Sequence, residues 1–173
     1  MHSLAVGVAA ERLAQSHPGR RDLHGDEVFV CGLLHDIGKL ALDHVLPQSY
    51  DRVIELADFN QGNIAQFERR IIGLDHHTAG KRLAEQWRLP HRLADCIWLQ
   101  GSAYDTLPEF EHRNLVALIS LADMLCRRQH IGYSGKYKFT QQADDLIERL
   151  KLDGPTVDRV VETGHEDVEE RAS

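Results

Sequence analysis

The sequence lacks the features of secreted, membrane-bound and disulfide-stabilised proteins. Its three cysteines, Cys31, Cys96 and Cys126, are widely spaced among apolar residues and form no CxxC pair, so we expect free thiols in a protein core. No run approaches the roughly 20 apolar residues of a membrane span, and the N-terminus has no basic region followed by an apolar block. These absences predict a cytoplasmic protein that does not bind membranes.

The chain also lacks an excess of positive charge. Its 20 lysines and arginines stand against 27 aspartates and glutamates, which gives a net charge of -7. Non-specific binding of nucleic acids requires a surplus of cations to displace phosphate counterions, so we expect no nucleic-acid partner. With 42% apolar and 27% charged residues over 173 positions, the composition is that of one ordinary globular domain.

The hydrophobic pattern is helical almost throughout, and no pair of strands is evident. Apolar side chains recur three and four residues apart in segments that are separated by loops containing proline or glycine. Such segments lie at residues 2–13, 28–34, 50–57, 115–125 and 143–150. We therefore predict an all-α, multi-helix bundle over residues 1–163, followed by an acidic, frayed tail over residues 164–173.

A histidine–aspartate doublet, His35-Asp36, directly follows the apolar segment 28–34. A buried, ionised carboxylate needs a cation or several hydrogen-bond donors. Adjacent residues of a helix diverge by about 100°, so the two side chains can act together only at a helix end or a bend, which Gly38 would permit. Taken alone, the doublet also fits a helix-end cap beside a surface histidine.

Asp123 interrupts a second apolar segment, where it shares a helical face with Val116, Ile119 and Cys126. A charge on such a face needs a partner. An ion pair with Arg127, four residues later, is one explanation. The other is that Asp123 binds a ligand together with the doublet.

Two histidines complete the set of polar residues on apolar helices. His2 lies on the face of Val6, Ala9 and Leu13, and His76 begins a segment of small residues. Each histidine alone also fits a hydrogen-bonded core residue. Together with the two aspartates, however, they form a donor set that suits iron, manganese, nickel or zinc better than calcium.

In order along the chain, His2, His35-Asp36 and Asp123 resemble the metal-binding residues of the HD superfamily of metal-dependent phosphohydrolases. Over most of its length the chain resembles the HDOD branch of that superfamily. The matching segments are His2-Ser3, the block Gly-Leu-Leu-His-Asp-Ile-Gly-Lys at 32–39, Glu68, Gly73-Leu74-Asp75-His76, Gly80, Trp87-Arg88-Leu89-Pro90 and Leu121-Ala122-Asp123. The resemblance implies an HD-domain-like helical bundle.

The resemblance also implies roles for individual residues. The ligands of one metal ion would be His2, His35, Asp36 and Asp123. Asp36 would be able to bridge to a second ion, for which His76 matches an additional ligand of binuclear HD enzymes, including the HD-GYP phosphodiesterases. Lys39 matches a lysine that faces the substrate phosphate, so Asp36 and Lys39 are the catalytic candidates. A solvated lysine at a helix end is an equal explanation for Lys39.

The sequence departs from the family pattern in three places. Gln100-Gly101 stand where binuclear relatives and many HDOD domains have a His-His pair, so we expect a mononuclear site. The GYP block is absent, and Gly132-Tyr133-Ser134 lie elsewhere and fit a loop. HDOD proteins usually carry a helical segment before the His-Ser element, so we expect that this segment is missing here and that His2 lies near a chain end.

Two functions follow from the resemblance. The first is an HDOD-type signalling output domain that keeps the metal site and acts through protein partners. The alternative is an active metal-dependent phosphohydrolase, in which a single metal ion would polarise a nucleotide or another small phosphoester and activate water. An unrelated helical bundle with accidental motifs is a third interpretation. The sequence leaves open whether the protein is an enzyme.

Overall fold

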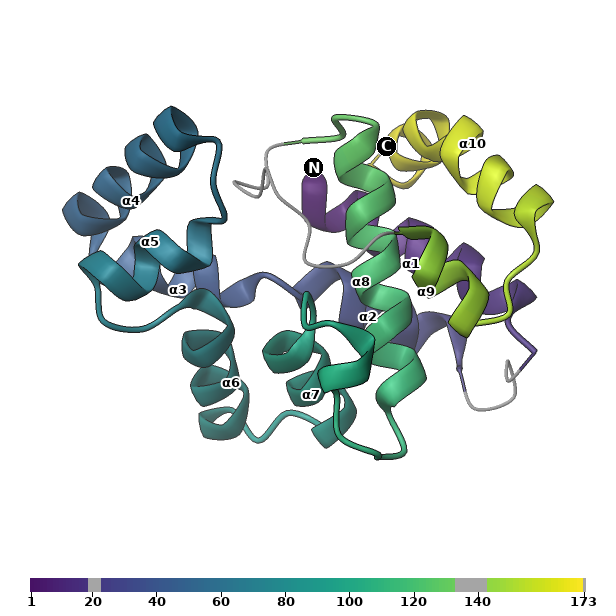
Figure 1. Cartoon of the computed structure of the whole chain (residues 1–173), viewed down its shortest axis with the longest axis horizontal. Coiled ribbons are helices and arrows are strands. Elements are labelled where there is room, and N and C mark those ends of the chain that lie inside the picture. The colour runs from purple at the N-terminus through teal and green to yellow at the C-terminus, as the bar shows by residue number, and fades with distance from the viewer. Residues whose placement is uncertain (19–22, 133–142, 173) are drawn as a thin grey trace.

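The computed structural model describes residues 1–18, 23–132 and 143–172, which form ten α-helices and one short 3-10 turn (Figure 1). The helices are α1 (His2–Ser16), α2 (Gly25–Leu34), α3 (Ile37–Val45), α4 (Pro47–Asn60), α5 (Ile64–Ile71), α6 (His76–Gln86), α7 (His91–Leu99), α8 (Arg113–Arg128), α9 (Ala143–Arg149) and α10 (Gly154–Ala172). The 3-10 turn spans Tyr104–Thr106. The prediction of an all-α bundle is confirmed. Tyr133 and Ser134 lie outside the described residues.

The larger of two hydrophobic cores is built around α8. Every residue of α8 from Leu115 to Cys126 is buried, as expected for the long apolar segment in the sequence. Figure 1 shows α8 running through the middle of the larger lobe, with α1, α2, α9 and α10 around it. The cysteines Cys31, Cys96 and Cys126 are free and buried in this core, as predicted.

The smaller core joins α3, α4 and α5, which lie together on the left in Figure 1. Leu42, Tyr50, Val53, Ala57 and Ile64 form its buried centre. Asn63 caps the N-terminus of α5, because its side chain accepts a hydrogen bond of 3.0 Å from the backbone N–H of Ala65. α6 contacts both α3 and α7, so it links the two cores.

The chain bends between α2 and α3, where the His-Asp doublet lies. The bend is at His35 and Asp36, before Gly38, which belongs to α3. Gly38 has a different role from the one expected of it. A Cβ atom at this position would lie 1.9 Å from the carbonyl oxygen of His76 and 2.7 Å from the backbone nitrogen of Gly80. The absence of a side chain therefore lets α3 pack directly against the backbone of α6.

The acidic C-terminal residues belong to α10 as far as Ala172, and Val168 within them is buried. Fraying of the tail in solution, and the domain boundary at residue 163, stay predictions. Over residues 1–18, 23–132 and 143–172, no helix combines the length and the apolar character that crossing a bilayer would require.

Candidate metal centre

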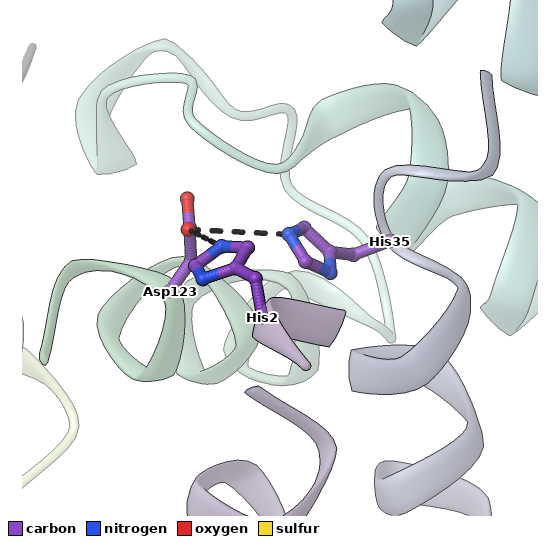
Figure 2. A group of neighbouring side chains, drawn as sticks. All are labelled: His2, His35 and Asp123. Atoms are coloured by element: carbon purple, nitrogen blue, oxygen red, sulfur yellow. Dashed lines mark hydrogen bonds and ion pairs between the residues drawn. The ribbon is translucent and has the colours of Figure 1, made fainter. Parts of the chain in front are cut away.

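Three of the predicted ligands meet in the larger core, although they are far apart in the sequence. His2 begins α1, His35 follows α2, and Asp123 lies in the middle of α8. Figure 2 shows both imidazoles turned toward the Asp123 carboxylate, whose Oδ1 atom lies 3.0 Å from His2 Nε2 and 3.9 Å from His35 Nε2. One donor atom from each of the three residues lies within 4.8 Å of the others. This grouping is compact enough to surround a single ion.

Asp36 joins this group and extends it toward α6. Its Oδ2 atom lies 3.3 Å from His35 Nε2 and accepts a hydrogen bond from the Lys39 ammonium. Its Oδ1 atom lies 3.5 Å from His76 Nε2 and accepts a hydrogen bond of 3.1 Å from the amide of Gln100. The two oxygens of one carboxylate therefore face two different histidines. The structure brings all five predicted ligands together; their binding of a metal stays a prediction.

The three histidines of the candidate centre are held in the same way. In His2, Nδ1 lies 3.1 Å from the carbonyl oxygen of Ile131. In His35, Nδ1 lies 2.7 Å from the carbonyl oxygen of Gly32. In His76, Nδ1 lies 2.6 Å from Oε2 of Glu68. A carbonyl oxygen can only accept a hydrogen bond, and Glu68 Oε2 also accepts the backbone N–H of His76, so Nδ1 carries the proton in each ring. In each neutral imidazole, Nε2 then presents a lone pair.

His2 Nε2 lies at hydrogen-bond distance, 3.0 Å, from Asp123 Oδ1, so both ring nitrogens of His2 face acceptors. The Nε2 atoms of His35 and His76 face the oxygens of Asp36, which are also electron-rich. His35 Nε2 is buried and forms no hydrogen bond with the described residues. A proton or a metal ion between the imidazoles and carboxylates would remove the repulsion. Neutral imidazole nitrogens together with carboxylates are a typical donor set for transition metals, and metal-ligating histidines usually donate their other N–H to a carbonyl or carboxylate. The residues present therefore fit a divalent transition-metal ion.

Asp123 pairs with Arg127 and still directs one carboxylate oxygen at the histidines; its binding of a ligand stays a prediction. Arg127 Nη2 lies 3.0 Å from Oδ2, and Arg127 Nε donates a hydrogen bond of 3.3 Å to the Asp123 backbone carbonyl. The other oxygen, Oδ1, faces His2 and His35. The ion pair thus orients the carboxylate and leaves one oxygen directed into the centre.

Glu68 is a functional candidate that the sequence analysis matched to the family pattern without assigning it a role. It is completely buried, and its Oε2 atom accepts hydrogen bonds from both the backbone N–H and Nδ1 of His76, at 2.8 and 2.6 Å. Its Oε1 atom accepts a hydrogen bond of 3.3 Å from the Tyr50 hydroxyl. Burial raises the pKa of Glu68 to about 7 and also raises that of Tyr50. In the sequence, Glu68 lies four residues after Ile64 and three before Ile71, so helical spacing already indicates that it shares an apolar face and is buried.

Lys39 and Gln100 complete the surroundings of Asp36. The Lys39 side chain is 14% exposed, and the ammonium group is directed at Asp36; its contact with a substrate phosphate stays a prediction. Gln100 is buried, and its Nε2 atom lies 3.1 Å from both Asp36 Oδ1 and His77 Nδ1. The sequence identified Gln100 only as a departure from a histidine pair, whereas the structure shows that it contacts a candidate ligand.

Solved structures with the same fold come from several bacteria. An HDOD domain protein of unknown function from Geobacter sulfurreducens is 26% identical, with a TM-score of 0.78 over 99% of this chain and 59% of its own. A protein from Marinobacter aquaeolei VT8, provisionally described as a signal transduction protein, is 20% identical, with a TM-score of 0.80 over 99% of this chain and 38% of its own. A provisionally described phosphohydrolase from Shewanella amazonensis SB2B is 18% identical, with a TM-score of 0.72 over 97% of this chain and 61% of its own.

The chain thus spans between 38% and 61% of the length of these three structures. No curated protein matches its sequence. The HDOD domain family, by contrast, matches residues 1–102, which include α1 to α7 and four of the five predicted metal ligands. The chain belongs to the HDOD family.

Proposed function

We propose that this chain is an HDOD-type signalling output domain whose buried centre binds one divalent transition-metal ion. The observation that carries the proposal is the shared arrangement of three imidazoles. In each, Nδ1 is held by an acceptor and Nε2 faces Asp36 or Asp123. Such an arrangement is poorly balanced without a cation and well suited to one.

The ligands of the proposed ion are His2, His35, Asp36 and Asp123. Two imidazoles and two carboxylates favour iron, manganese, nickel or zinc. Arg127 holds Asp123 from the opposite side, and Lys39 is hydrogen-bonded to Asp36. These two cations match the two carboxylates in number. The reason for a metal ion at this position is therefore the group of imidazole nitrogens that face carboxylate oxygens, and not an excess of negative charge.

Burial of the centre favours a signalling role over catalysis. Catalytic metal sites keep a coordination position open to substrate. Here His35, His76 and Asp123 are each 1% exposed, and the other two predicted ligands no more than 8%. A buried ion of this kind stabilises one arrangement of the surrounding helices, and we propose that a protein partner recognises that arrangement. Membership of the HDOD family and the similarity to the Marinobacter protein support this interpretation.

A metal-dependent phosphohydrolase is the second candidate, and the position of Lys39 favours it. Its ammonium group lies beside Asp36 at the edge of the centre, where it would neutralise a nucleotide phosphate or another small phosphoester. Asp36 would accept a proton during hydrolysis. When bound, a metal ion would act as a Lewis acid toward a phosphoryl oxygen. The fold shared with the Shewanella protein is consistent with this candidate.

Elemental analysis of tag-free protein tests the metal centre. The protein is offered manganese, iron and zinc, and is compared with a His35→Ala/Asp36→Ala variant. The matched control is His112→Ala/Asp95→Ala, because this His-Asp pair, 2.9 Å apart, lies outside the centre. We expect one ion per chain in the wild type and the control, and none in the first variant. A folded wild type that retains no metal would contradict the proposal.

Phosphoester turnover distinguishes the two candidates. We expect the metal-loaded protein to leave p-nitrophenyl phosphate and bis-p-nitrophenyl phosphate unchanged, as a signalling domain would. Turnover that is lost in both the His35→Ala/Asp36→Ala and Lys39→Met variants would favour the phosphohydrolase instead.

A further inference from the structure

One half of the Asp36 carboxylate faces away from the proposed ion. Its Oδ1 atom lies 3.5 Å from His76 Nε2. Two donor atoms that each lie about 2.1 Å from one metal ion are separated by roughly 3 to 3.5 Å. Asp36 Oδ1 and His76 Nε2 are thus spaced as two ligands of a second ion would be.

His76 is also held in an orientation suited to metal binding. Glu68 fixes both its backbone N–H and its Nδ1, so Nε2 faces Asp36 with a lone pair. This carboxylate–histidine pair is a common support of metal ligands. His76 and Asp36 alone would therefore permit a second ion, so another residue must limit the centre to one.

Gln100 lies on the other side of Asp36 Oδ1. It is 1% exposed, and its Nε2 atom is 3.1 Å from Asp36 Oδ1 and 3.1 Å from His77 Nδ1. An amide nitrogen donates hydrogen bonds and does not accept them, so its two N–H groups are directed at these two atoms. The amide supplies Asp36 Oδ1 with the positive partial charge that a cation would otherwise provide.

We propose that Gln100 determines the metal stoichiometry of the centre by excluding a second ion from the space between Asp36 Oδ1 and His76 Nε2. This inference rests on the proposed metal-binding function. The amide nitrogen has no lone pair available for a metal, and its hydrogens repel a cation that approaches Asp36 Oδ1. The site for a second ion therefore has two ligands in place and a hydrogen-bond donor where a third ligand is needed.

The Gln100→Glu variant reverses this chemistry with little change in shape. It replaces the donor with an anionic oxygen next to Asp36, and two neighbouring carboxylates favour a cation between them. Gln100→His offers an imidazole nitrogen as an alternative third ligand. Gln86→Glu is the matched control, because it adds the same charge at an exposed position of α6.

The experiment is a titration of Mn²⁺ into the metal-free wild type and these three variants. Stoichiometry is measured by isothermal titration calorimetry, and magnetic coupling between neighbouring ions by electron paramagnetic resonance. We expect one ion in the wild type and in Gln86→Glu, and two coupled ions in Gln100→Glu. Adding His76→Ala to Gln100→Glu should return the stoichiometry to one, whereas His76→Ala alone should leave it at one.

The outcomes separate this inference from the proposed function. Two ions in the wild type, or one ion in a folded Gln100→Glu variant, would overturn the role of Gln100 and leave the metal centre intact. No ion in the wild type but one in Gln100→Glu would contradict the proposed function and support the role of Gln100. No ion in either protein would contradict both. If Gln100→Glu does not fold, Gln100→His decides by the same criteria.

Discussion

The Nε2 atom of His35 lies 3.3 Å from Oδ2 of Asp36, the residue that follows it in the sequence. On a continuous helix, the two side chains would diverge by about 100°. They converge because α2 ends at Leu34, and Asp36 has φ -106° and ψ 19° before α3 begins. The bend therefore allows one doublet to direct two ligands at the same centre, and anything that shifts α3 should disturb it.

Gly38→Ala should shift α3 and destabilise the protein. Its new methyl group would lie 1.9 Å from the carbonyl oxygen of His76. The backbones of α3 and α6 would have to separate, and this separation would move the His-Asp bend. We expect the free energy of unfolding in urea to fall by about 3 kcal/mol. Gly154→Ala is the control, because no atom lies within 4 Å of its added methyl group. Equal stability of the two variants would contradict this account of the α3–α6 contact.

Metal binding should stabilise the folded chain. The ligands come from α1, α8 and the α2–α3 bend, so the complete site exists only in the folded state. At a free Mn²⁺ concentration of 100 times the dissociation constant, the free energy of unfolding should rise by about 2.7 kcal/mol. Thermal unfolding with Mn²⁺ and with a chelator measures this rise. His35→Ala should show none, and an equal rise in that variant would place the ion elsewhere.

Arg127→Ala should make stability depend more strongly on metal. The Arg127 and Asp123 side chains are 8% and 1% exposed, and loss of one partner leaves a buried charge poorly compensated. We expect the metal-free protein to lose about 3 kcal/mol of stability. A bound divalent ion would compensate Asp123, so the metal-induced rise in melting temperature should exceed that of the wild type. The exposed neighbour provides the control variant, Arg128→Ala, and a rise no larger than that of the control would be evidence against this role.

The helices and the positions of the candidate ligands could be predicted from local sequence patterns. Apolar spacing of three and four residues identifies the buried face of each helix, and a histidine or aspartate on that face stands out. The position of Asp123 on α8 is an example, because Val116, Ile119 and Cys126 on the same helical face are all apolar. Such patterns report burial, but they do not report which buried groups from different helices meet.

Gln100 and Glu68 show what local patterns miss. Gln100 reaches Asp36 across 64 positions of the sequence, and Glu68 reaches His76 from a different helix. The acceptor for His2 is the backbone carbonyl of Ile131, which any residue type could have supplied. These partners are set by the packing of α1 against α8 and of α3, α5, α6 and α7 against one another. The positions of the protons on the histidines therefore become clear only once the helices are in place.

Glu68→Ala should lower the free energy of unfolding substantially, although Glu68 is not a ligand of the proposed ion. The change leaves two N–H groups of His76 and the Tyr50 hydroxyl without the acceptor they have in the wild type. Each buried donor without an acceptor costs about 1 to 3 kcal/mol, so we expect a loss of about 4 kcal/mol in urea unfolding. Glu68→Gln, which keeps one carbonyl acceptor, should lose roughly half as much. Glu55→Ala is the control, because its exposed ion pair with Arg52 should contribute less than about 1 kcal/mol. If Glu68→Ala were as stable as Glu55→Ala, Glu68 could not be the group that holds His76 in place.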